Sequence, residues 1–369
     1  MRGVDVLKAI HRWSLRRRLA AAGSSLVVVL ALTGGLVLGT ASSASAGSSC
    51  IKLALEFKLQ GLAVFTANQT GVNDAAKAYG ICSPVAYGGP ATASASGQVT
   101  DIESDISKKV NVIAITSDDP AVPATELKAA MKAGIKVITF DSDVPSARSF
   151  FIQDTAYNTI AQGVINAAVK AEGSSAEFGI MSSTSTATIQ LAWIKAMQAY
   201  VKTKYPKITW APIGYGQSIV ATSLAQAEAM IHANPKLKAI LPIDGNAVIG
   251  TAEAVADLND SGKIGVFGIG EPLSNRTYFA NGSLQALFLW NEIGQGEMID
   301  CVSYLAHNNK IKAGSTFTCP HGPSGSLVSG PASWTVATGP NATTGANKNT
   351  IVFSDPLEFT KANYKQFNF

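Results

Sequence analysis

Residues 137–154 read VITFDSDVPSARSFFIQD, and this stretch decides the fold. Its apolar, β-branched start belongs to a run at residues 135–140, which follows Gly134 and stops abruptly at Asp141 and Asp143. Such a run indicates a buried parallel strand. In open α/β sheets, ligands bind beyond the carboxyl ends of the strands. The stretch therefore predicts a ligand site at its aspartates, unless these residues only form a turn.

Strand and helix patterns alternate on both sides of this stretch. The first series of strands is predicted, with helical spacing between them, at residues 51–57, 81–87, 112–115 and 135–140. The plan then repeats, with strands predicted at residues 177–181, 208–215, 239–243, 263–269 and 287–290. Parallel strands need crossover connections, which helices of this length supply. The sequence therefore predicts an α/β fold of two Rossmann-like lobes with parallel sheets and a ligand cleft between them.

Residues 1–46 are predicted to be a signal peptide. A basic segment at residues 12–18 precedes an apolar run at residues 26–38, and an A-x-A cleavage site stands at residues 44–46. An uncleaved membrane anchor and lipid attachment at Cys50 are the alternatives. Export as a soluble protein is favoured, to the periplasm or to the extracellular face of the cell membrane.

The formal charge of +4 comes from the same N-terminal segment. Six of the 29 basic residues and one of the 25 acidic residues precede Gly47, which leaves 23 basic against 24 acidic groups, a net charge of −1. The exported chain therefore has no charge bias toward nucleic acid or a membrane surface.

The four cysteines are expected to form disulfides in an oxidising compartment. Three pairings are possible, and four free thiols are the alternative. Cys50 opens the first predicted strand and Cys82 lies at the second, whereas Cys301 and Cys319 flank a late turn. We predict the pairs Cys50–Cys82 and Cys301–Cys319.

Motifs for catalysis, metal binding and cofactor binding are missing from the sequence. The four histidines are scattered, and there is no G-x-S-x-G, P-loop or complete G-x-G-x-x-G. Residues 257–268 imitate the start of a calcium loop, but Gly268 occupies the position that requires a bidentate glutamate. We expect no enzymatic activity, no metal and no cofactor.

Polar residues stand instead at the ends of predicted strands in both lobes. Asp141 belongs to the first lobe, Asp244 and Asn246 follow a strand of the second, and Trp290 follows a strand near the return to the first. Carboxylates and amides form paired hydrogen bonds with vicinal hydroxyls, and an aromatic face covers the apolar side of a sugar ring. These residues together predict a site for a small hydroxylated ligand.

The chain resembles a type I periplasmic binding protein, the exported receptor of an ABC sugar importer. The resemblance is greatest to the branch that binds autoinducer-2 and rhamnose, and it covers nearly all of the exported chain. It rests on the segments GVNDAAKAYG (71–80), SGQ (96–98), TFDSD (139–143), DGNA (244–247), LWN (289–291) and the C-terminal FNF.

The resemblance also implies individual site residues. Lys58 stands where autoinducer-2 receptors place a ligand-binding lysine, Asp141 matches their strand-end aspartate, and Gln190 matches the glutamine of their D-Q pair. The residue before it is Ile189 instead of aspartate, and Ile243 and Gly245 replace the proline and first alanine of their P-D-A-N-A segment. Losing a carboxylate removes a strong acceptor, so a different ligand is expected.

By the same resemblance, the lobes are joined by a three-strand hinge near residues 151–154, 285–289 and 313–317. The N-terminal lobe would comprise residues 47–152 and 289–314, and the C-terminal lobe residues 153–288 and 315–369. The expected function is that of a monomeric receptor that delivers a sugar or polyol to a membrane ABC permease. A ligand-sensing module that signals to a membrane receptor and a secreted carbohydrate-active enzyme are the alternatives.

Overall fold

The computed structural model describes residues 50–92, 94–319, 333–341 and 344–369. Residues 48–369 form one compact unit, and the following description concerns that unit. The predicted signal peptide lies outside the described residues.

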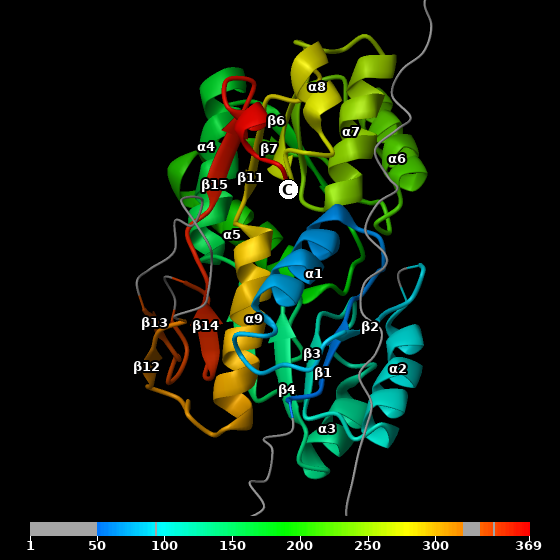
Figure 1. Cartoon of the computed structure of the whole chain (residues 1–369). Coiled ribbons are helices and arrows are strands. Elements are labelled where there is room, and N and C mark those ends of the chain that lie inside the picture. The colour runs from blue at the N-terminus through cyan, green and yellow to red at the C-terminus, as the bar shows by residue number, and fades with distance from the viewer. Residues whose placement is uncertain (1–49, 93, 320–332, 342–343) are drawn as a thin grey trace, which may run out of the picture. The chain divides into compact units, whose positions relative to one another are not determined.

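The first lobe is built on a six-stranded sheet with the order β14-β5-β4-β3-β1-β2, in which all neighbouring strands are parallel (Figure 1). One pair of helices, α1 and α9, packs together, with α9 against β3 and β4, and a second pair, α2 and α3, packs together against β1 and β4. The strands are β1 (Leu53–Glu56), β2 (Ala86–Gly88), β3 (Val112–Ile115), β4 (Lys136–Phe140), β5 (Phe150–Gln153) and β14 (Thr350–Val352). The helices are α1 (Ala63–Ala75), α2 (Ala95–Ser107), α3 (Ala124–Lys132) and α9 (Glu292–His307).

The second lobe repeats this plan with a seven-stranded sheet of order β15-β11-β10-β9-β6-β7, in which β8 also pairs with β6. All pairs are parallel except the edge pair of β11 with β15. The strands are β6 (Glu177–Ser182), β7 (Thr209–Trp210), β8 (Gly214–Tyr215), β9 (Leu237–Pro242), β10 (Gly265–Ile269), β11 (Ala286–Leu289) and β15 (Leu357–Thr360). The helices are α4 (Tyr157–Glu172), α5 (Thr188–Lys204), α6 (Val220–Ala233), α7 (Gly245–Asp257) and α8 (Arg276–Asn281).

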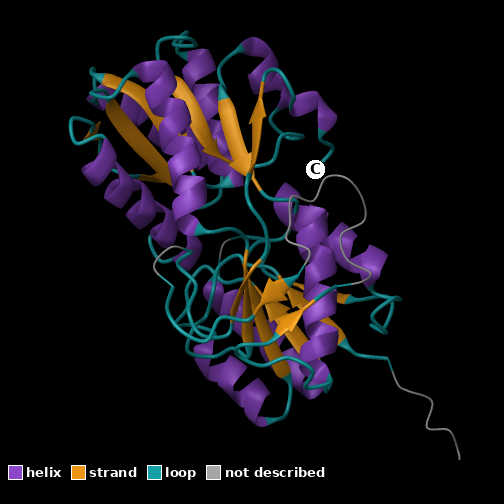
Figure 2. Cartoon of the chain, turned by 90° about the vertical axis from the view of Figure 1, so that its left-hand side faces the viewer, coloured by secondary structure: helices purple, strands orange, loops and turns teal. Residues whose placement is uncertain are grey.

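Helices flank the strands of each sheet, as Figure 2 shows. This cover explains why strands such as Val112–Ile115 and Phe150–Gln153 are buried at every residue. Strands buried on both faces are typical of parallel sheets and read as continuous apolar runs. The predicted α/β class, the two lobes and the parallel sheets are confirmed.

One predicted strand is divided in the structure. Residues 208–215 form two short strands, β7 and β8, which both pair with β6. Pro212 lies between them, and a proline has no N–H for the sheet ladder. The pattern of apolar residues did not show this interruption.

Along its described strands, the chain passes between the sheets three times. It does so after β5, after β11 and between β14 and β15. These crossings follow residues 153, 289 and 352, whereas the sequence analysis expected hinge strands near residues 151–154, 285–289 and 313–317. Because β14 pairs with β5, residues 350–352 belong to the first sheet, whereas the sequence analysis placed all of 315–369 in the second lobe. The apolar run at 351–353 did not reveal which sheet it joins.

Both predicted disulfides are present, Cys50–Cys82 and Cys301–Cys319. A further pair of strands, β12 (Thr316–Phe317) and β13 (Trp334–Thr335), lies on either side of Cys319 in the sequence, and a 3₁₀ helix, η1 (Tyr364–Gln366), lies near the C-terminus. Within the described residues, no helix combines the length and the apolar character needed to span a membrane.

Candidate functional site

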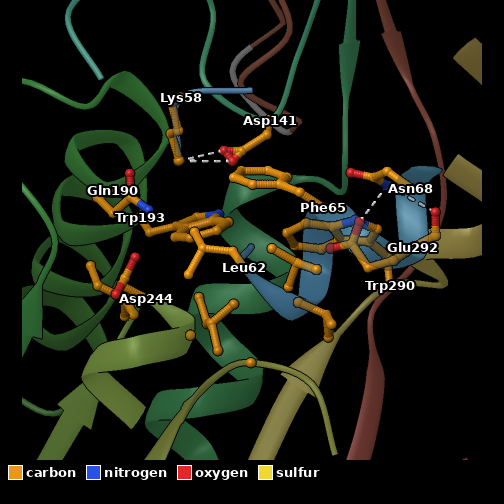
Figure 3. Close-up of a pocket in the computed structure, with 16 residues that line it drawn as sticks. Lys58, Leu62, Phe65, Asn68, Asp141, Gln190, Trp193, Asp244, Trp290 and Glu292 are labelled. Atoms are coloured by element: carbon orange, nitrogen blue, oxygen red, sulfur yellow. Dashed lines mark hydrogen bonds and ion pairs between the residues drawn. The ribbon is translucent and has the colours of Figure 1, made fainter. Parts of the chain in front are cut away.

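A cavity lies where the carboxyl ends of strands from both sheets converge (Figure 3). This is the location that parallel α/β sheets offer to ligands. Its lining combines a small number of polar groups with aromatic and aliphatic side chains. The lining residues are Lys58, Leu62, Val64, Phe65, Asn68, Asp141, Gln190, Trp193, Ile243, Asp244, Gly245, Ile269, Gly270, Leu289, Trp290 and Glu292.

Lys58 and Asp141 form a buried ion pair in this cavity. The Lys58 Nζ atom lies 2.7 Å from Asp141 Oδ1 and 3.1 Å from Oδ2, and it donates a further hydrogen bond of 3.2 Å to Ser142 Oγ. Burial alone would lower the pKa of Lys58, but the charges of Asp141 and Asp118 raise it above its ordinary value. The ammonium group therefore stays charged, and Asp141 keeps its partner.

The backbone at Asp141 turns sharply as β4 ends. Its φ is 53°, in the left-handed region that residues with a Cβ seldom adopt, although aspartate tolerates it better than most. The Thr116 hydroxyl donates to Asp141 Oδ1 at 3.3 Å and accepts from the Ser142 N–H at 3.1 Å. Thr116 thus ties the end of β3 to this turn and helps to hold the carboxylate toward Lys58.

Asp143, two residues further on, has a structural role. Its carboxylate pairs with Arg148 at 2.7 Å and accepts a hydrogen bond of 2.5 Å from the Thr139 hydroxyl. It is not among the residues that line the cavity. The two aspartates of the quoted stretch therefore have different environments.

Gln190 and Asp244 contribute the polar groups of the second lobe. Gln190 is buried near the start of α5, and its Oε1 atom has no hydrogen-bond partner among the described residues. Asp244 caps α7, because its Oδ1 accepts from the Ala247 N–H at 3.1 Å and its Oδ2 accepts from the Ser218 hydroxyl at 2.8 Å. Burial raises the pKa of Asp244, although the charge of Lys58 opposes the shift.

Asn246, which we also predicted to bind ligand, is not among the lining residues. Its side-chain amide donates a 2.7 Å hydrogen bond to the Ser218 carbonyl. Both residues therefore bind Ser218: Asn246 contacts its backbone carbonyl, and Asp244 contacts its hydroxyl.

Two tryptophans form an aromatic part of the wall. The rings of Trp193 and Trp290 have centroids 6.0 Å apart and are tilted by 44°. Trp290 Nε1 donates to Gln295 Oε1 at 3.2 Å, whereas Trp193 Nε1 is buried and has no partner among the described residues. The Trp193 N–H is therefore a donor available within the cavity.

A buried polar network connects the cavity wall to two of the crossings. The Asn68 amide of α1 donates to the Glu292 backbone carbonyl at 2.8 Å and to Glu292 Oε2 at 2.7 Å, and Gln295 donates to Asp154. Burial, together with neighbouring carboxylates, raises the pKa of Asp154 and of Glu292 well above the ordinary values.

Comparison with known proteins places this arrangement in a family. Residues 54–300, more than half of the chain, match the family described as "Periplasmic binding protein domain". The chain belongs to the periplasmic binding protein family. The family consists of exported solute-binding proteins, so the predicted resemblance is confirmed at this level.

Solved structures of periplasmic binding proteins share the fold. A solute-binding protein of an ABC transporter from Clostridium phytofermentas, with bound L-rhamnose, is 27% identical, has a TM-score of 0.78 and is matched over 86% of this chain and 98% of that one. LsrB from Clostridium saccharobutylicum, in complex with AI-2, is 24% identical with a TM-score of 0.77 over 86% and 99% of the two chains. A protein from Burkholderia graminis in complex with D-arabinose is 20% identical with a TM-score of 0.69 over 86% and 98%.

Sequence reasoning missed several residues of this periplasmic binding protein's cavity. The sequence analysis did not single out Trp193. Asn68 and Glu292 lie 224 positions apart on helices whose contact no local pattern reveals.

Proposed function

We propose that this protein is the extracytoplasmic solute-binding component of an ABC transporter, which binds a small sugar or sugar-like polyol in the cavity and delivers it to a membrane permease. The cavity itself carries the proposal, because strand ends of both sheets bring hydrogen-bonding groups and aromatic rings together in a buried space. This combination suits a ligand that has hydroxyl groups on its rim and C–H groups on its faces.

The lining residues support specific roles in this proposal. The Lys58 and Asp141 pair would donate to and accept from adjacent hydroxyls, while Gln190 Oε1 and the outer lone pairs of Asp244 would accept hydrogen bonds. Trp290 and Trp193 would cover the apolar face of the ring. Asn246 would act by positioning Asp244 and not by touching the ligand.

A thermal-shift screen of the purified protein tests the function. The panel comprises pentoses, hexoses, deoxyhexoses, polyols and AI-2, because similar structures hold L-rhamnose, D-arabinose and AI-2. A ligand at 100 times its Kd stabilises the folded state by about 2.7 kcal/mol. We expect a clear shift with at least one sugar, and no shift with any of them would contradict the proposal.

A ligand-sensing module is the second candidate, and the similarity to LsrB in complex with AI-2 favours it. The same cavity would serve both roles, so the partner distinguishes them. Purified permease in lipid nanodiscs is expected to bind the liganded protein in the transport role. If only a membrane sensor binds the liganded form, the sensing role replaces the first.

We further propose an organisation that accounts for the third crossing. The N-terminal lobe would comprise residues 47–152, 289–314 and the segment around β14, and the C-terminal lobe would comprise residues 153–288 and the segment from β15 onward. The protein would act as a monomer after removal of residues 1–46, in the periplasm or at the extracellular face of the membrane. Mass measurement of the exported protein tests both the cleavage and the monomeric state.

A further inference from the structure

Gln295 lies in the first turn of α9, behind the cavity wall. It is fully buried, and it is not among the residues that line the cavity. Its backbone N–H donates to the Asn291 carbonyl at 2.9 Å, and the Asn291 side chain caps the helix by accepting from the Gly294 N–H at 3.0 Å. Because α9 begins directly after the crossing that follows β11, the backbone of Gln295 is held close to that crossing.

Two side chains of the cavity wall donate to the amide oxygen of Gln295. Trp290 Nε1 donates to Oε1 at 3.2 Å, and the Asn68 amide donates to the same atom at 3.1 Å. Both donors belong to residues that line the cavity. An indole N–H can only donate, so the buried Trp290 ring needs an acceptor at this position.

The amide nitrogen of Gln295 binds the first crossing. Its Nε2 donates to Asp154 Oδ1, and Asp154 directly follows β5. The Asp154 carbonyl accepts a 3.1 Å hydrogen bond from the Ser354 N–H, on the crossing between β14 and β15. Two donors on one side and a carboxyl group on the other fix the orientation of the amide. One side chain therefore connects the cavity wall with the segments of all three crossings.

The hydrogen bond from Gln295 matters because the Trp290 indole has another acceptor close to it. That acceptor is the carboxyl group of Glu292, which also lines the cavity. An indole turned toward Glu292 would present a different part of its ring to the cavity and to Trp193, whose ring centroid lies 6.0 Å from that of Trp290. The amide of Gln295 thus selects between two orientations of the ring.

We propose that Gln295 is a positioning residue of the ligand site, whose amide sets the orientation of the Trp290 indole and anchors this part of the cavity wall to the crossing at Asp154. Gln295 acts through Trp290 and does not touch the ligand. The wall then has its binding orientation before the ligand arrives, which raises affinity because less freedom is lost on binding. This inference rests on the proposed function and adds to it a residue outside the cavity.

The first test observes the Trp290 indole by NMR without any ligand. In protein with isotope-labelled tryptophan, the indole N–H signal of Trp290 is assigned by its absence in Trp290→Phe. We expect this signal to move in Gln295→Met, which removes the acceptor. The matched control is Gln153→Met, which removes another buried glutamine, one whose amide donates to the carbonyls of Thr155 and Thr344. The control is expected to leave the Trp290 signal in place.

The second test is a double-mutant cycle measured by calorimetric titration with L-rhamnose and D-arabinose. Gln295→Met is expected to weaken sugar binding about tenfold in the wild-type background, the effect of about one hydrogen bond. In the Trp290→Phe background, which has no indole N–H, the same change is expected to weaken binding by less than about threefold. The hydrogen bond from Asn68 is lost in both backgrounds, so the difference reports the contact with Trp290.

The third test examines the anchor at Asp154 with a conservative and a disruptive substitution. Asp154→Asn keeps an oxygen that accepts from Gln295, whereas Asp154→Leu removes it. Sugar affinity is expected to stay within about twofold of wild type in Asp154→Asn and to fall about tenfold in Asp154→Leu. This pair also decides the matter if Gln295→Met does not fold.

Each result has a definite consequence. An unmoved Trp290 signal in Gln295→Met, or equal weakening by Gln295→Met in the two backgrounds, overturns the inference and leaves the proposed function standing. The same holds if Asp154→Asn and Asp154→Leu bind sugar equally, or if Gln153→Met weakens binding as much as Gln295→Met. If wild type binds no sugar at all, the proposed function fails, and this inference fails with it.

Discussion

The Lys58 ammonium lies in a site whose other charges are acidic, and the residues around it illustrate how position determines the role of a carboxyl group. Asp141 is paired with Lys58, Asp143 with Arg148, and Asp244 caps a helix. Glu56 and Asp105, by contrast, are buried beside each other in the first lobe and do not line the cavity. Two testable consequences follow from these environments.

Lys58→Met is expected to abolish sugar binding and to destabilise the protein by about 3–5 kcal/mol, because it leaves Asp141 buried without its cation. Adding Asp141→Leu to Lys58→Met is expected to recover part of the stability but none of the binding. Denaturant unfolding and sugar titration measure the two effects, and Lys52→Met, at an exposed lysine, serves as control. Normal sugar affinity in Lys58→Met would exclude this pair from the site.

Stability is expected to fall as the pH rises toward alkaline values, because of Glu56. Burial, with a further contribution from Asp105, raises the pKa of Glu56 from 4.5 to about 9. Between these two pKa values, the folded state keeps a proton that the unfolded chain releases. The stabilisation that comes from protonated Glu56 is therefore complete below about pH 4.5 and is lost as the pH rises through about 9. Asp300, whose pKa burial also raises to about 9, acts in the same direction.

Glu56→Gln keeps a neutral hydrogen-bonding group and is expected to reduce the pH dependence. At pH 9 it should be more stable than wild type by about 1–3 kcal/mol, the cost of a buried group without its hydrogen bond. Thermal melting between pH 5 and pH 9 measures this difference, with the exposed Glu103→Gln as control. Parallel melting curves for wild type and Glu56→Gln would contradict the assignment.

At the level of elements, the packing of α1 against α9 brings the segments that carry Asn68 and Glu292 together. Gly71 and Gly296 permit this contact, since a Cβ at Gly71 would overlap the Ile293 carbonyl and one at Gly296 would overlap the Asn68 carbonyl. The backbones of the two helices approach closely at these positions, and the Asn68 side chain reaches Glu292 there.

Gly71→Ala is therefore expected to separate the two helices. We expect a loss of stability of about 1–3 kcal/mol, typical of overpacking, and weaker sugar binding, because Phe65 and Asn68 of the same helix line the cavity. Thermal unfolding and titration measure the two effects. Gly339→Ala is the control, since nothing lies within 4 Å of its added Cβ; equal stability of the two variants would show that α1 and α9 tolerate separation.

The elements also show what the sequence could and could not predict. Residue patterns predicted the order of strands and helices, and the strand-end rule found Asp141, Asp244 and Trp290, because it depends only on local sequence. Lys58 and Gln190 followed from resemblance. Asn68, Glu292 and Trp193 were missed because their roles depend on helices that meet only in the folded chain, and the partner of β14 was missed because an apolar run fits either sheet.

At the level of the whole molecule, two hydrogen bonds between described residues join the lobes away from the crossings. The Thr186 hydroxyl donates to the Asp118 carbonyl at 2.9 Å, and the Thr188 hydroxyl donates to the Asp143 carbonyl at 3.1 Å. Both threonines lie at the start of α5, beside Gln190. These bonds require the lobes to be close, so they contribute to the closed arrangement and not to the folding of either lobe.

The double variant Thr186→Val and Thr188→Val is accordingly expected to weaken sugar binding by about tenfold, since each hydrogen bond contributes about 0.5–1.5 kcal/mol. The melting temperature without sugar should change little. Titration and thermal melting test this, with the exposed Thr203→Val as control. A drop in the sugar-free melting temperature without a change in affinity would assign the two hydroxyls to folding instead.

The late position of β14 and β15 has a consequence for synthesis of the protein. Each sheet receives an edge strand from residues 350–360, so a nascent chain that has been translated only to residue 340 has neither. The edges of β5 and β11 stay open until then, and exposed strand edges invite pairing with other chains. Neither sheet is complete until these residues are available, so each lobe can finish folding only after nearly the whole chain has been made and delivered to its destination.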